Sequence, residues 1–234
     1  MDGGLIYKNN NMRVIFLAHR KWAINVFKTI KKNPILTEIV FCESSMELEK
    51  IDLKKFNVLL TCGTSSKLSK KILEEIETIG VHCAELDRYS YGSPIQNQIL
   101  DGINFTKHRI FKLSYDENSI RSHAHDRLFS HEVELDLSGN MDDIFSQLTS
   151  TSIILFNKYL NDFPKISWTE WPKEEIIRKR RVPSDSKLFK EQMLNMSTKE
   201  LYDFFRCLEA PYPNGYIEDE IGSLYINKVS FKKK

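Results

Sequence analysis

The chain has 234 residues, of which 41% are apolar and 28% charged, and its formal net charge at pH 7 is +2. This size and apolar content suffice for one full hydrophobic core with a small appendage. A net charge so close to zero provides no general attraction to nucleic acid or to a membrane surface, which argues against both as partners. No apolar run is long enough to span a membrane, and the first residues lack the layout of a secretory signal.

The cysteines are scattered and have none of the spacings of a zinc site or a disulfide framework. They are Cys42, Cys62, Cys83 and Cys207. We therefore expect no metal in the protein and a reducing, cytoplasmic setting.

The first hundred residues alternate predicted strands with predicted helices. Continuous apolar runs predict strands at 13–17, 38–42, 57–61 and 79–82. Apolar positions at helical spacing predict helices at 21–32 and 67–78, and Ser93 followed by Pro94 is typical of the start of a helix, here 94–100. The alternation predicts an α/β, Rossmann-like core with a mostly parallel sheet. In such a sheet ligands bind at the carboxyl ends of the strands.

The second half of the chain is predicted to complete this core and to add a small subdomain. Two strands, a long amphipathic helix, a capped helix and a hairpin are expected, at 108–113, 128–137, 140–160, 197–209 and 216–226. We predict a disordered leader over 1–11, a catalytic domain over 12–165, and a linker with a small C-terminal subdomain over 166–234.

One segment places a histidine, a loop and the start of a helix in a recognisable order. Within VHCAELDRYSYGSPIQNQILDG, residues 81–102, His82 precedes Pro94-Ile95-Gln96 by twelve residues. This layout resembles the active-site segment of the folate-dependent formyltransferases, which reads Asn-x-His, then a loop, then Pro-Ile-Gln. The family's Asn is Gly80 here.

Two later segments resemble the same family in the same order. Arg181-Val182-Pro183-Ser184-Asp185-Ser186 is similar to the family's Arg-x-Pro-Glu-Asp-Ser, and residues 205–213, FRCLEAPYP, are similar to Ile-Arg-x-Leu-x-x-Pro-Tyr-Pro. The resemblance thus runs from about Met12 to the end of the chain. The short tail looks more like that of the enzymes that formylate nucleotide-linked amino sugars than like the C-terminal barrel of methionyl-tRNA formyltransferase.

The resemblance implies a set of site residues. His82 would stabilise the oxyanion or accept a proton from the attacking amine, since imidazole titrates near neutral pH. An ungapped count places the family's Asp at Asn118, with Asp116 as a nearby carboxylate, whereas an alignment anchored on the next strand allows His123. The predicted cofactor contacts are Cys62, Gly63, Thr64 and Gly80. The predicted substrate contacts are Glu85, Ser93, Gln96 and Asn97, although helix capping alone would explain Ser93.

The implied function is formyl transfer from N10-formyltetrahydrofolate to a nucleotide-linked amino sugar in polysaccharide synthesis. The alternatives are a methionyl-tRNA formyltransferase, a degenerate paralogue that binds ligand without transferring formyl, and a hydrolase in which His82 and a carboxylate activate water. The basic run Arg178–Arg181 is either a solvated surface or a contact for a nucleotide diphosphate. The C-terminal hairpin could support a homodimer, because a two-stranded unit is marginal alone.

Overall fold

The computed structural model describes residues 11–65, 67–89, 92–115, 124–171 and 178–233. Most of the predicted leader, together with Asp116, Asn118 and His123, lies outside these residues. The chain forms two compact units, one made of residues 1–81, 110–131 and 152–170 and the other of residues 82–109, 132–151 and 171–234. The predicted division at residue 165 stays a prediction. Within the described part, no helix is long and apolar enough to cross a membrane.

The main sheet has seven strands in the order β2-β1-β3-β4-β5-β6-β7. Their bounds are β1 Met12–Leu17, β2 Leu36–Cys42, β3 Val58–Thr61, β4 Thr78–His82, β5 Phe105–Ser114, β6 Ala124–Asp136 and β7 Thr169–Glu170. Strand β1 pairs in parallel with β2 and β3, and β3 pairs in parallel with β4, whereas β7 is antiparallel to β6. The predicted mostly parallel sheet is confirmed.

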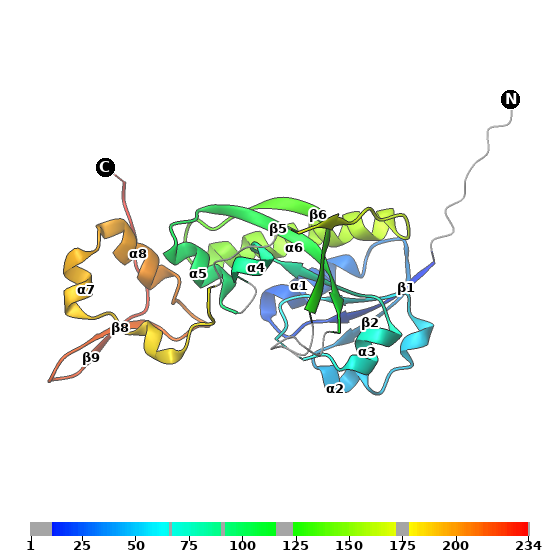
Figure 1. Cartoon of the computed structure of the whole chain (residues 1–234), viewed down its shortest axis with the longest axis horizontal. Helices are drawn as coiled ribbons and strands as arrows, with labels where there is room; N and C mark the ends of the chain where they lie inside the picture. Colours follow the sequence, from blue (N-terminus) through cyan, green and yellow to red (C-terminus); the bar gives the residue numbers. More distant parts are fainter. Residues whose placement is uncertain (1–10, 66, 90–91, 116–123, 172–177, 234) are drawn as a thin grey trace, which may run out of the picture. The chain divides into compact units, whose positions relative to one another are not determined.

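Strand β1 is buried on both faces, as expected of a central parallel strand. Leu17 belongs to a cluster with Leu48 of α2 (Ser45–Leu48) and residues of α3 (Lys70–Glu75). Because successive side chains alternate, Phe16 faces the other way, where its ring centroid lies 5.7 Å from that of Phe27 in α1 (Lys21–Ile30) and 5.6 Å from that of Phe156 in α6 (Met141–Asp162). Figure 1 shows α1 and α3 on opposite faces of these strands.

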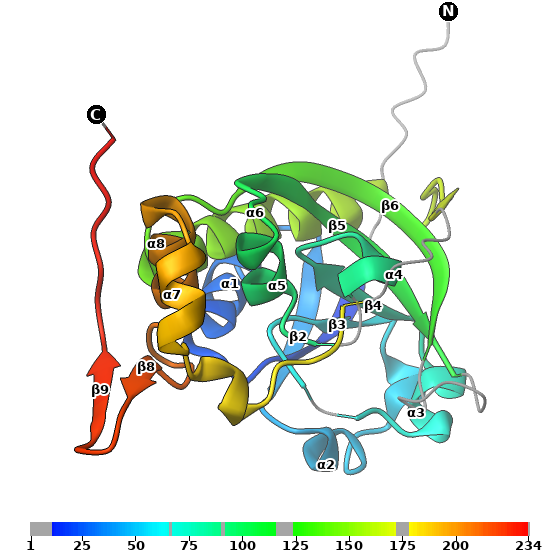
Figure 2. The same cartoon turned by 60° about the vertical axis from the view of Figure 1, so that its left-hand side comes forward.

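The second unit contains most of the shorter helices. They are α4 Leu86–Tyr89, α5 Pro94–Leu100, α7 Lys190–Asn195, α8 Thr198–Arg206 and the 3-10 helix Pro183–Ser186. Another 3-10 helix, Leu53–Lys55, lies in the first unit. Helix α8 lies beside α5 (Figure 2). The predicted capping box is present, because Ser197 Oγ accepts from Glu200 N and Glu200 Oε2 accepts from Ser197 N.

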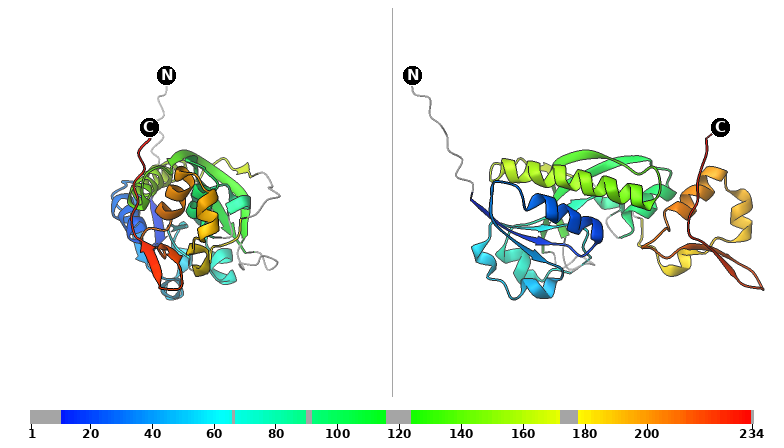
Figure 3. Two further views of the ribbon diagram at one scale, coloured as in Figure 1. Left: turned by 90° about the vertical axis from the view of Figure 1, so that its left-hand side faces the viewer. Right: turned by 180° about the vertical axis from the view of Figure 1, so that it is seen from behind.

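The predicted C-terminal hairpin is also confirmed. Strands β8 (Gly215–Glu218) and β9 (Ser223–Ile226) pair antiparallel, and Figure 3 shows them together with α7 and α8. The reversal is closed by a hydrogen bond of 3.0 Å from Asp219 N to Gly222 O. Tyr216 and Tyr225 face each other across the two strands and stack, with ring centroids 5.2 Å apart, so cross-strand packing helps to hold the register.

Candidate functional site

The strand order changes direction at β1, since the chain passes from β1 to β2 on one side and then to β3 on the other. In an open α/β sheet, ligands bind outside the carboxyl ends of the two strands that flank such a switch. Beyond the end of β1 lies the exposed side chain of His19, and beyond the end of β3 lie residues 62–64. Sequence reasoning missed His19, because the strand order is needed to locate the switch.

The loop after β3 contains three predicted cofactor contacts in different environments. Cys62 is 1% exposed and its Sγ lies 3.9 Å from the hydroxyl of Ser152, and burial raises the pKa of the thiol. Gly63 and Thr64 are half-buried. Gly63 has a φ of +53°, and an added Cβ would lie 2.9 Å from Trp22 and Ala23, so packing alone requires glycine there. Cofactor contact by this loop stays a prediction.

Phe111 occupies the space into which a side chain at position 80 would extend. A Cβ added to Gly80 would lie 2.6 Å from two ring carbons of Phe111 and 3.0 Å from Thr61 Oγ1. That hydroxyl donates to Ile79 O over 3.2 Å, so it is fixed in place. Gly80 can therefore offer only main-chain atoms to a ligand. At this position, where the formyltransferase pattern has Asn, the chain has neither a side chain nor room for one.

His82 is the last residue of β4, and the segment after it is held by α5. Gln98 of α5 is 1% exposed, and its Nε2 donates to Cys83 O over 2.8 Å and to Pro94 O over 3.1 Å. Its Oε1 is buried without a hydrogen-bond partner in the described part of the chain. The amide of Gln98 thus fixes the main chain beside His82, a role that the sequence pattern did not reveal.

A second histidine, His108 of β5, interacts electrostatically with His82. It is 1% exposed and its Nδ1 lies 2.7 Å from Thr151 Oγ1 in α6. The Thr151 hydroxyl donates to Gln147 O over 2.7 Å, so it must accept the proton on His108 Nδ1. Burial, assisted by the charge of His82, lowers the pKa of His108 to about 3. His108 is therefore neutral at physiological pH and can carry no charge that competes with one on His82.

The predicted substrate contacts around α5 are mostly buried. Gln96 and Asn97 are each 3% exposed, and the Asn97 amide donates to Gly92 O and Lys179 O. Ser93 is at the N-cap position as predicted, but it has a φ of +53° and makes no capping hydrogen bond, because its Oγ instead accepts from Arg181 N. Glu85 is exposed. Substrate contact by these residues stays a prediction.

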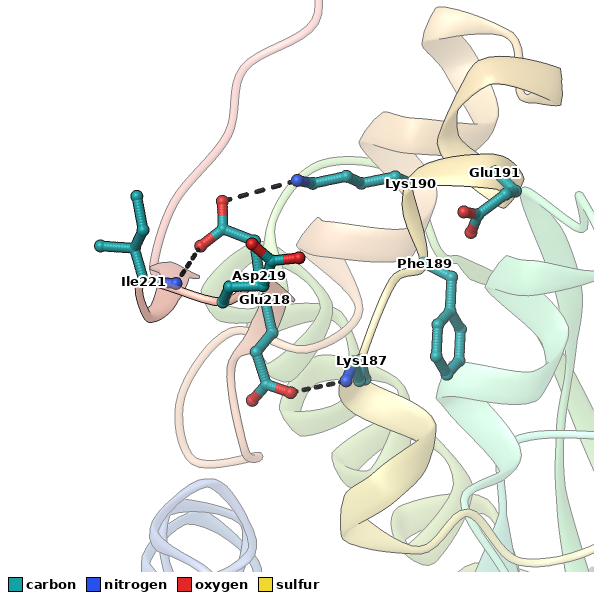
Figure 4. Close-up of a pocket in the computed structure, with 8 residues that line it drawn as sticks. Lys187, Phe189, Lys190, Glu191, Glu218, Asp219 and Ile221 are labelled. Carbon is teal, nitrogen blue, oxygen red and sulfur yellow. Dashed lines mark hydrogen bonds and ion pairs between the residues drawn. The ribbon is translucent and has the colours of Figure 1, made fainter.

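A separate hollow of about 360 Å³ lies near the hairpin in the second unit (Figure 4). Its charged groups already pair, Lys187 with Glu218 over 2.6 Å and Lys190 with Asp219 over 3.5 Å. It has no histidine or cysteine in its lining, so it is a poor candidate for catalysis. Within the described residues, no group of three or more His, Cys, Asp or Glu side chains could hold a metal ion.

Comparison of the sequence with protein-family models and with curated proteins gives no match. Solved structures match along almost the whole chain. A methionyl-tRNA formyltransferase from Clostridium thermocellum superposes with a TM-score of 0.75 at 23% identity, covering 94% of both chains. A 4-N formyltransferase from Francisella tularensis superposes with a TM-score of 0.71 at 15% identity, covering 95% of this chain and 99% of that one.

The chain has the formyltransferase fold. HypX from Aquifex aeolicus, solved in complex with tetrahydrofolic acid, shares it with a TM-score of 0.67 at 12% identity, over 88% of this chain and 36% of that one. The predicted fold class, a Rossmann-like core followed by a small helix and hairpin, is therefore confirmed. At these identities the likeness establishes the architecture, and the chemistry has to be argued from the residues.

Proposed function

We propose that this protein transfers a formyl group from N10-formyltetrahydrofolate to the amine of a nucleotide-linked amino sugar. The observation that carries formyl transfer is the likeness to formyltransferases along almost the full length of this chain. The near-neutral net charge of +2 is what favours a small acceptor over tRNA. His82 supports formyl transfer, because it is the last residue of β4, and such folds bind ligands at the carboxyl ends of their strands.

In the proposed reaction the cofactor supplies a formyl group already activated for attack by an amine. The protein must then stabilise negative charge on the formyl oxygen and take a proton from the attacking nitrogen. We assign proton transfer to His82, whose neighbour His108 is neutral at physiological pH. Gln98 keeps the main chain next to His82 in place through its hydrogen bond to Cys83 O.

The cofactor fits the described residues only in part. Gly63 and Thr64 are half-buried after β3, and Phe111 fills the space that a side chain at position 80 would occupy. This observation favours a second candidate function, a paralogue that binds folate or a nucleotide sugar without turnover. Loss of one oxyanion donor typically reduces turnover by about 10² to 10³, so slow transfer and no transfer are the outcomes to distinguish.

The test compares the wild type with His82→Asn and with the matched control His131→Gln. Binding of a stable folate analogue is measured by calorimetry, and formylated product is measured on a panel of nucleotide-linked amino sugars and on methionyl-tRNA. We expect His82→Asn to retain folate binding and to lose about 10² to 10⁴ in turnover, while the control keeps both.

Each alternative gives a different result. Folate binding without product on any acceptor would indicate the paralogue that binds ligand without turnover, and not the transferase. Formate release that needs no acceptor and depends on His82 would indicate the hydrolase, and product on methionyl-tRNA alone would indicate the tRNA enzyme. Absence of folate binding would overturn the proposal.

A further inference from the structure

The basic run Arg178–Arg181 is not a loosely solvated segment. Arg178 N donates to Arg88 O over 2.7 Å, and Lys179 O accepts from the amide of Asn97 over 3.0 Å. Both Arg178 and Arg88 have side chains that are more than half buried, at 39% and 34% exposed. The run is therefore fixed against α4 and α5, and Arg178 lies beside Arg88.

One carboxylate serves two of these arginines. Asp101 accepts from Arg178 over 3.1 Å and lies 3.6 Å from Arg88, and it also accepts from the hydroxyl of Tyr89 over 2.9 Å. Since a single negative charge faces two guanidinium groups, positive charge remains at this point of the described surface. The Nε atoms of both arginines are buried without a hydrogen-bond partner in the described residues.

The same run contains two further arginines, Arg180 and Arg181. The stem of Arg180 lies over Gly92, where a Cβ would come within 2.9 Å of it, and φ at this glycine is +112°. Arg180 is exposed, and no ion pair to a described residue is present. Arg181 donates to the main-chain oxygen of Asp185, which leaves its charge unneutralised by that contact.

Helix α5 connects this cluster with the candidate catalytic residue. Asn97 of α5 holds Lys179, and the adjacent Gln98 holds Cys83, the residue that follows His82. The cluster and the histidine are thus positioned by two consecutive residues of one helix.

We propose that Arg88, Arg178, Arg180 and Arg181 bind the diphosphate group of the nucleotide-linked substrate. Guanidinium groups bind phosphate oxygens in pairs and retain their charge when partly buried. A net charge of +2 does not provide the broad basic surface that RNA binding requires. The identity of the ligand rests on the proposed function above, whereas the anion site itself does not.

The test uses uridine and thymidine diphosphates and inorganic pyrophosphate as calorimetric probes on the full chain. The variant Arg88→Gln/Arg180→Gln removes two charges and keeps Arg178 paired with Asp101. Lys32→Gln/Lys50→Gln removes two exposed charges elsewhere and serves as the control. We expect the arginine variant to bind the diphosphates at least roughly tenfold more weakly, with an unchanged Tm and unchanged affinity for a folate analogue, and the control to match the wild type.

Turnover separates this site from the proposed reaction. In a formylation assay, the arginine variant should raise KM for the nucleotide-linked amine and leave kcat unchanged. Diphosphate binding without folate binding would support the anion site and contradict the proposed formyl transfer. Folate binding and formyl transfer without diphosphate binding would contradict the anion site and support the proposed formyl transfer. An equal loss in the lysine control, a parallel loss of folate affinity, or tighter binding of transfer RNA than of the diphosphates would also overturn the assignment.

Discussion

At the residue scale, the contact between Gly80 and Phe111 decides which side chains position 80 can hold. An oxyanion donor contributes to catalysis when it is held in place before the charge forms, and neither residue offers a side-chain hydrogen bond. The two positions are coupled through space, because a Cβ on Gly80 would lie 2.6 Å from the Phe111 ring. A donor at position 80 therefore requires a smaller residue at position 111.

We expect Gly80→Asn alone to lower the free energy of unfolding by about 1–3 kcal/mol through overpacking. In Gly80→Asn/Phe111→Ala the loss should be smaller than the sum of the two single losses, because the clash is gone. If the carboxamide then reaches the formyl oxygen, formyl transfer should exceed that of Phe111→Ala by about 10². Urea unfolding and product formation measure the two effects, with Gly80→Ala as the control; additive stability losses would contradict the coupling.

His108 makes a pH-dependent contribution to stability. Its pKa falls from 6.5 in the unfolded chain to about 3 in the folded protein, so below pH 6.5 the unfolded chain binds the extra proton. The stability that neutral His108 contributes is fully present above pH 6.5. As pH falls from 6.5 toward 3, the free energy of unfolding decreases by about 1.4 kcal/mol per pH unit. His108→Asn, which can still donate to Thr151, should lose stability less steeply. Urea unfolding between pH 7 and 4 measures this, and equal slopes would contradict it.

At the element scale, helix α8 is attached to the segment between β6 and α6 by one buried side chain. Arg206 is 1% exposed, and it donates to Asp203 Oδ1 over 2.6 Å, to Leu137 O over 2.6 Å and to Gly139 O over 2.9 Å. It lies in the segment that resembles the family's Ile-Arg-x-Leu. The motif thus has a structural explanation in this unit, because the arginine pairs with carbonyl groups that would otherwise be left unsatisfied.

Arg206→Met should therefore destabilise the protein by about 3–5 kcal/mol, since it removes the donor to two carbonyl groups and leaves the buried Asp203 with Lys199 as its ion-pair partner. Adding Asp203→Asn should recover part of this loss, because the buried carboxylate that has lost its buried partner is then neutral. Thermal and urea unfolding of the two variants measure the difference. A double variant no more stable than Arg206→Met would show that the charge on Asp203 is not the cause.

At the scale of the whole molecule, the choice of acceptor in the proposed function rests on charge, because the fold leaves it open. The structural likeness includes both a tRNA enzyme and a 4-N formyltransferase, with TM-scores of 0.75 and 0.71. Architecture alone does not separate them. A formal net charge of +2 over 234 residues gives no long-range field for a polyanion as large as tRNA, and this difference favours the smaller acceptor.

Local sequence patterns were enough to predict the strands and helices with strong periodicity. Apolar spacing predicted the strand Arg13–Leu17, and the Ser-Pro start predicted the helix 94–100. These elements lie at Met12–Leu17 and Pro94–Leu100. The short helices α2, α4 and α7 and the strand β7 were not predicted. Elements of two to six residues are too short to form stably by themselves or to show a clear periodic pattern. Whether they form depends on tertiary packing.

His82 is the candidate residue that sequence spacing could single out, because its distance from Pro94-Ile95-Gln96 is a property of the chain. The neutral state of His108, the Phe111 ring against Gly80 and the arginines gathered around Asp101 were decided only by the tertiary structure. Each depends on residues far apart in the sequence that the fold brings within a few ångströms. Burial, desolvation and charge pairing act through space, so no local pattern could have revealed them.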